Sequence, residues 1–330
     1  MSQLVLACFV FVFTLAGNLG ISVSILQLKR REEGRFQDRT RHNDVLFLGL
    51  TIGNLLGNLL VFPPLFYMYD MAERGMDIPG SLCVVIGSLE AFYFTYSAVL
   101  VALQHVHHLF SIVFPFQYLI YSRKKHSKIP KFCICVSFLI AAASTTISAT
   151  VEPKSYKYIH GFGNVTFYCV PDFTSSWKFM PITIVGVICL LVTFGIYGRI
   201  LFEFVKIKEH QNQIGRVYNG CCVCLGFPSG SCFIIAKGIL YFTWGPLTIM
   251  LVLNKWSEGY HIAPEAYIIT HAMLFIPPLL GPIVFYSTHN DLQEVCNEAL
   301  CKLLSKTTYQ PNRQDGNQGA PVVFELACRP

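Results

Sequence analysis

The chain has 330 residues, of which 53% are hydrophobic and 13% are charged, against about 25% charged residues in an average soluble domain. Long stretches contain no Asp, Glu, Lys or Arg and exceed the roughly 20 apolar residues that a helix needs to cross a bilayer. This composition excludes a soluble globular, disordered or collagen-like protein. The net charge of +6 does not indicate nucleic-acid binding, because membrane proteins collect Lys and Arg on their cytoplasmic side.

Apolar runs, interrupted by charged and turn residues, predict seven membrane-spanning helices. The predicted spans are 3–28, 45–69, 81–114, 132–150, 179–204, 232–253 and 262–286. The first run is not read as a signal peptide, because it lacks a preceding basic segment and is too long. We therefore predict an all-α membrane protein, a seven-transmembrane helix bundle. The predicted membrane domain covers 1–304 and ends in a short amphipathic helix after span seven, and 305–330 are predicted to form a disordered cytoplasmic tail.

The distribution of basic residues predicts the orientation of the bundle. With the N-terminus outside, 20 of the 25 Lys and Arg residues fall in cytoplasmic segments. Only five fall outside: Arg74, Lys154, Lys157, Lys178 and Lys255. This asymmetry predicts an external N-terminus and an internal C-terminus. It also places Asn164, in Asn164-Val165-Thr166, on the external face as a glycosylation acceptor.

Short motifs occur along the predicted spans in a recognisable order. They are Gly17-Asn18, the run 50–56, Cys83 and Cys169, the run 112–118, Tyr197, Trp244-Gly245-Pro246 and Gly281-Pro282-Ile283-Val284-Phe285-Tyr286. Together they resemble the rhodopsin-like (class A) family of G-protein-coupled receptors over residues 1–304. The resemblance implies a receptor that carries an extracellular signal across the plasma membrane, with no catalytic activity and no cofactor.

The cysteines have different implied roles. The resemblance implies a disulfide between Cys83 at the outer end of span three and Cys169 in the second outer loop, where an oxidising compartment permits it. Cys296 and Cys301, on the short helix after span seven, are predicted palmitoylation sites. Four further cysteines lie near the inner end of span six: Cys221, Cys222, Cys224 and Cys232. Their spacing fits zinc poorly, so packing or palmitoylation is the favoured interpretation.

The inner motifs depart from the family pattern. His107 and His108 stand where the family has an acidic residue and an arginine, and Asn54 stands where it has an aspartate. A histidine, with a reference pKa of about 6.5, is only partly charged at neutral pH and lacks the planar guanidinium. We therefore predict weak or atypical coupling to a heterotrimeric G protein. Without the carboxylate at position 54, a hard cation such as sodium is not expected.

Four residues are expected, from the resemblance, to take part in switching: Tyr197, Trp244, Pro246 and Pro282. A proline removes a backbone hydrogen bond and kinks a helix. Pro246 and Pro282 can therefore be bends about which the inner helix halves swing, or they can be static kinks. The sequence leaves both interpretations open.

Glu90 is an acidic residue that falls well inside a span, about 10 Å below Cys83 at 1.5 Å per residue. An ionisable group in the membrane costs on the order of 3 kcal/mol by insertion scales and normally faces a cavity or a partner. Phe94, Trp244, Tyr267 and His271 complete the predicted ligand site. Glu90 either pairs with His271 or receives the cationic group of a small ligand, and both interpretations stay open.

Two other functional classes are alternatives to a receptor. A multi-pass transporter commonly has paired repeats and more intramembrane charge than this chain. A membrane oxidase could use His105, His107 and His108 as metal ligands, but the other seven histidines are scattered, so no metal site is predicted. A retinal protein would need a lysine within 262–286, and none is present.

Overall fold

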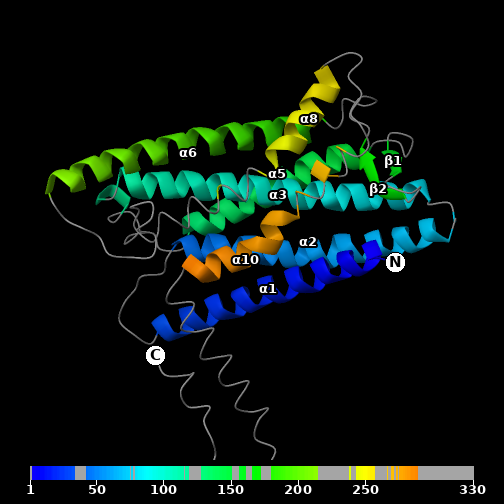
Figure 1. The fold of residues 1–330 in the computed structure, drawn as a ribbon, viewed down its shortest axis with the longest axis horizontal. Helices are drawn as coiled ribbons and strands as arrows, with labels where there is room; N and C mark the ends of the chain where they lie inside the picture. Colours follow the sequence, from blue (N-terminus) through cyan, green and yellow to red (C-terminus); the bar gives the residue numbers. More distant parts are fainter. Residues whose placement is uncertain are drawn as a thin grey trace, which may run out of the picture.

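The computed structural model describes residues 2–33, 42–74, 76, 79–114, 116–118, 128–150, 156–160, 166–171, 180–214, 238, 243–256, 266, 269–270, 273 and 275–288. These residues are almost entirely helical (Figure 1). The exception is an antiparallel hairpin of two short strands, β1 (Tyr156–His160) and β2 (Thr166–Pro171), in which Tyr158 pairs with Cys169.

The five long helices are α1 (Ser2–Glu33), α2 (His42–Glu73), α3 (Gly80–Val113), α5 (Lys128–Ala149) and α6 (Met180–Ile214). They coincide with the first five predicted spans. Within the described part of the chain, these five helices are long and apolar enough to cross a membrane. Two shorter helices, α8 (Gly245–Trp256) and α10 (Ile276–Thr288), lie within the predicted sixth and seventh spans or extend just past their ends. The remainder of those two spans lies outside the described residues.

Helix α3 is at the centre of the bundle. It contacts α2, α5 and α6 along its length and both strands of the hairpin near its beginning. Helix α1 packs against α2 and α10, and α8 packs against α6. The first residues of α1 and the hairpin lie at the same end of the bundle (Figure 1). The arrangement therefore places the segment around Cys169 at the end where α3 begins.

The distribution of polar and apolar side chains is the reverse of that in a soluble protein. Asn18, His105 and Ser137 are fully buried, whereas Phe132 and Leu139 of α5 are about two-thirds exposed. Lipid tails are as apolar as these exposed side chains, so the exposure costs nothing in a bilayer. Polar groups, in contrast, must find partners inside the bundle. The burial pattern therefore agrees with the membrane-spanning length of the helices.

Three glycines bring α2 close to its neighbours. Gly49, Gly53 and Gly57 recur every four residues and so lie on one face of the helix. A Cβ atom at Gly53 or Gly57 would overlap the ring of Tyr96 or Tyr93 of α3, respectively, and one at Gly49 would overlap Ile134 of α5. Small residues at this spacing let membrane helices pack closely.

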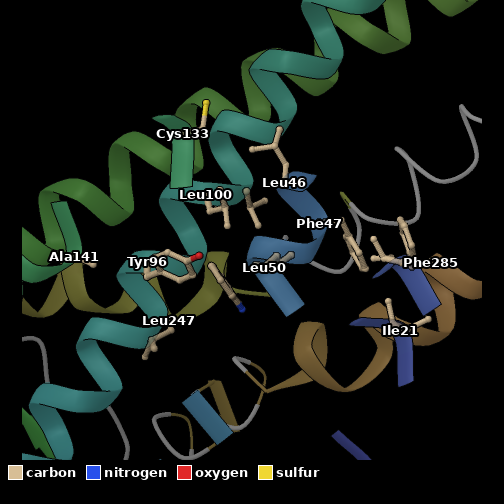
Figure 2. Packing of buried hydrophobic residues seen from close by; sticks show 13 residues of the cluster. Ile21, Leu46, Phe47, Leu50, Tyr96, Leu100, Cys133, Ala141, Leu247 and Phe285 are labelled. Atoms are coloured by element: carbon tan, nitrogen blue, oxygen red, sulfur yellow. The ribbon is translucent and has the colours of Figure 1, made fainter. Parts of the chain in front are cut away.

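Buried apolar side chains pack between the helices beside these close contacts. Figure 2 shows Leu46 and Leu50 of α2 beside Tyr96 and Leu100 of α3. On the other side of α2, the ring of Phe47 stacks on that of Phe285 of α10, with 3.7 Å between centroids and 9° between planes. This stacking holds the part of α10 around Phe285 against α2.

Candidate functional site

A chain of polar side chains crosses the interior of the bundle. Asn54 of α2 donates a hydrogen bond from Nδ2 to Oδ1 of Asn18 in α1, at 3.0 Å. The hydroxyl of Tyr93 in α3 donates to Oδ1 of Asn54, at 3.1 Å. Asn18 in turn donates from Nδ2 to the carbonyl oxygen of Pro278 in α10, at 2.9 Å. All three side chains are buried, so these hydrogen bonds join four helices.

The hydrogen bond from Asn18 replaces one that the backbone of α10 lacks. Pro282 has no N–H, so the carbonyl four residues earlier, that of Pro278, loses its normal helical donor. Asn18 supplies the replacement donor. Its second amide hydrogen goes to the carbonyl of Thr14, at 2.8 Å, which uses both donors of the amide. The adjacent Gly17 leaves room for the proline ring, because a Cβ there would lie 3.3 Å from Pro282 Cβ and Cγ.

Tyr93 is a member of this cluster that the sequence motifs do not reveal. Its ring lies against Gly57 of α2, and this contact brings its hydroxyl to Asn54. Asn58, one turn beyond Asn54, donates to the Asn54 carbonyl oxygen at 2.7 Å and so has a partner within its own helix. The sequence signal that could have identified Tyr93 is the four-residue spacing of the α2 glycines, which predicts a close helix contact.

Two of the predicted ligand-site residues lie together at a layer of aromatic rings. Phe94 of α3 meets Trp244 edge to face, with 6.1 Å between ring centroids. Phe94 also contacts Phe275, at 5.6 Å, and Tyr93, at 4.9 Å. Phe275 continues the layer to Phe62 of α2, at 5.1 Å. The Trp244 indole is thus linked through Phe94 to the tyrosine that enters the polar cluster.

Glu90 lies one helical turn before Phe94 on α3 and is buried, with 5% of its surface exposed. Position and burial agree with the prediction of an acidic group inside the bundle. Its predicted neighbours Tyr267 and His271 lie outside the described residues. The choice between an internal ion pair and a ligand site therefore rests on experiment.

At the other end of α3, histidines and tyrosines pack together. Tyr197 of α6 meets His105 edge to face, at 4.9 Å between centroids, and its ring lies against Gly238. His107 contacts His108, at 6.3 Å, and Tyr118, at 5.3 Å. His108 is buried and His107 is half-buried. The sequence analysis did not predict the contact between Tyr197 and His105.

The two switch prolines have different surroundings. Pro282 lies inside α10, as predicted for a helix bend. Pro246 lies in the first turn of α8, directly after the turn residues Thr243 and Trp244. A proline at the start of a helix removes no backbone hydrogen bond. The role of Pro246 as a bend stays a prediction, because residues 239–242 lie outside the described part of the chain.

The other predicted sites are only partly described. Cys83 lies in the first turn of α3 and is buried, and the backbone of Cys169 belongs to β2. Asn164, Cys296 and Cys301 lie outside the described residues. Across the described ranges, no group of three or more His, Cys, Asp and Glu side chains is placed to hold a metal ion.

No protein-family model matches the sequence, and a search of curated proteins finds no match either.

Proposed function

We propose that the chain is a plasma-membrane receptor of the rhodopsin-like G-protein-coupled type, which spans the bilayer seven times with its N-terminus outside. Its partners are an extracellular small-molecule ligand, the lipid bilayer and, with atypical coupling, a heterotrimeric G protein. It uses no cofactor and catalyses no reaction.

The observation that carries the proposal is the meeting of motif residues that are far apart in the sequence. Gly17 and Asn18 of α1 contact Pro282 and the Pro278 carbonyl, about 260 residues later, and Asn54 of α2 joins them. These are the positions on which the family resemblance rests. A bend in α10 that depends on side chains of other helices can be altered when those helices move.

The aromatic layer supports a role in signalling. Trp244 touches Phe94, which lies one turn from Glu90 on α3. A ligand bound near Glu90 would therefore contact, or lie next to, the rings that lead to Tyr93 and the polar cluster. A change of packing in this layer is the simplest route from a ligand to the Pro282 bend.

The disulfide between Cys83 and Cys169 belongs to the same proposal. Cys83 lies in the first turn of α3, and β2, which carries Cys169, contacts α3. A covalent link at this point would pin the hairpin over the outer end of the bundle. With an external N-terminus, Asn164 between the two strands would be available for glycosylation.

Purified protein in lipid vesicles distinguishes a receptor from the alternative, a transporter or membrane enzyme. We expect nucleotide exchange on added G proteins, with or without ligand, and no net flux of small solutes. Solute flux without any effect on G proteins would contradict the proposal.

The ligand class is tested at Glu90. If Glu90 receives a cationic ligand group, Glu90→Gln should weaken binding of an identified agonist by about tenfold or more, the effect of losing a charge-assisted hydrogen bond. His271→Ala should then have little effect or improve binding, because it removes a competing internal partner. Radioligand binding measures both variants. Unchanged affinity in Glu90→Gln would rule out a cation site and leave the structural pair with His271.

A further inference from the structure

The hydroxyl of Tyr93 is the point at which the central helix α3 joins the polar cluster of α1, α2 and α10. Oδ1 of Asn54 accepts the bond from Tyr93, and Nδ2 of the same amide donates to Asn18. The amide of Asn54 therefore has a fixed orientation, with its oxygen toward α3 and its nitrogen toward α1. If the amide turned over, its oxygen would face Oδ1 of Asn18, another acceptor, and the hydrogen bond between the two amides would be lost.

The Asn18 amide has the orientation that matches that of Asn54. Because Oδ1 of Asn18 accepts from Asn54, its Nδ2 faces away, toward the carbonyls of Thr14 and Pro278. Pro278 is the residue whose carbonyl Pro282 leaves without a helical donor. The direction of hydrogen bonding therefore runs from the Tyr93 hydroxyl to the weakened backbone of α10.

We propose that Tyr93 is a positioning residue that couples α3 to the Pro282 bend. Its hydroxyl ties to α3 the Asn54 amide and, through it, the Asn18 amide that donates to the Pro278 carbonyl. All members of this chain are uncharged, so it transmits movement of α3 by hydrogen-bond geometry. The inference deepens the proposed receptor function, although it does not depend on which ligand or transducer is used.

The neighbouring Tyr96 provides a matched control in the same helix interface. It lies three residues after Tyr93, its ring lies against Gly53 as that of Tyr93 lies against Gly57, and both side chains are buried. Its hydroxyl donates to the backbone carbonyl of Gly49, at 3.0 Å. That bond ends on α2 and does not continue to Asn18 or α10.

The test is hydrogen exchange of the α10 backbone, measured by mass spectrometry on the full chain in detergent micelles. We expect Tyr93→Phe to speed exchange in the segment 276–288 by about tenfold, the effect of about one buried hydrogen bond. Tyr96→Phe should affect α2 and leave this segment within about twofold of wild type. Equal effects of the two variants on α10, or no effect of Tyr93→Phe, would overturn the proposal.

A double variant tests whether Tyr93 acts through Asn54. Asn54→Leu removes the intermediate amide, so adding Tyr93→Phe should change α10 exchange by less than twofold further. If the two single-variant changes in the α10 exchange rate multiply in the double variant, the two residues act independently. This outcome too would overturn the proposal. Because the measurement reads helix opening and not signalling, its failure is distinguishable from failure of the proposed receptor function.

Discussion

The absence of a side chain at Gly57 is what allows the Tyr93 ring to lie against the α2 backbone. Gly57→Ala places a methyl group inside the volume of that ring, and overpacking of this kind costs about 1–3 kcal/mol. We expect a lower free energy of unfolding, measured by denaturant titration in detergent micelles. The matched control is Gly20→Ala in α1, where a Cβ meets nothing within 4 Å. It should be neutral or slightly stabilising, since alanine is the better helix former.

Equal destabilisation by Gly57→Ala and Gly20→Ala would mean that the ring contact is unimportant.

His107 and His108 lie toward the end of α3, at positions where the receptors that the sequence resembles have an acidic residue and an arginine. His108 is buried and His107 contacts Tyr118. An imidazole does not supply the permanently charged, planar guanidinium of an arginine. We expect the double change His107→Asp with His108→Arg to raise basal or ligand-dependent nucleotide exchange on G proteins. Matched surface expression of the two proteins is the necessary control. Strong wild-type exchange that falls after the double change would contradict atypical coupling.

The sequence identified some site residues and could not identify others, for a physical reason. Asn18, Asn54 and Pro282 were recognisable because each stands in a short motif. Tyr93 carries no such mark, because its role arises only where its hydroxyl meets an amide from another helix. Tyr197 was expected to take part in switching. Its contact with His105 could not be predicted, because it depends on how α6 is rotated against α3.

Helix α10 depends on α1 for the hydrogen bond that Pro282 removes. Asn18→Ala leaves the Pro278 carbonyl without this donor, and an unsatisfied buried group costs about 1–3 kcal/mol. Adding Pro282→Ala restores an N–H four residues after Pro278, so the carbonyl regains a helical partner. We therefore expect the double variant to be more stable than the sum of the two single effects predicts, as measured by denaturant titration.

Strict additivity of Asn18→Ala and Pro282→Ala would show that the Asn18 bond does not compensate for the proline. Pro282→Ala alone serves as the control for any loss of contact with Gly17.

At the scale of elements, the first five predicted spans are confirmed as helices. They could be predicted because their apolar runs are long and bounded by charged residues. The hairpin was missed, although Tyr156–His160 and Thr166–Pro171 are rich in aromatic and β-branched residues, which favour strands. Pro246 lies in the first turn of α8, and its role as a bend stays a prediction. A proline is compatible with a helix start or a helix bend, and periodicity alone does not distinguish them.

The described helices combine an exterior rich in apolar side chains with buried polar side chains that gather around α3. Composition alone predicted the first of these properties, because apolar residues exceed what a core of this size can bury. The second required knowledge of which helices are neighbours. The contact between α1 and α10 joins opposite ends of the sequence, and no local pattern indicates it.

The number of spans and their orientation form the central claim about the whole molecule, and the sides on which the two chain ends lie test it most directly. Epitope tags fused to Met1 and Pro330 can be stained in intact and in permeabilised cells. An odd number of spans with an external N-terminus predicts that the tag at Met1 is stained in intact cells and the tag at Pro330 only after permeabilisation. Staining of both tags on the same side would contradict a seven-span receptor.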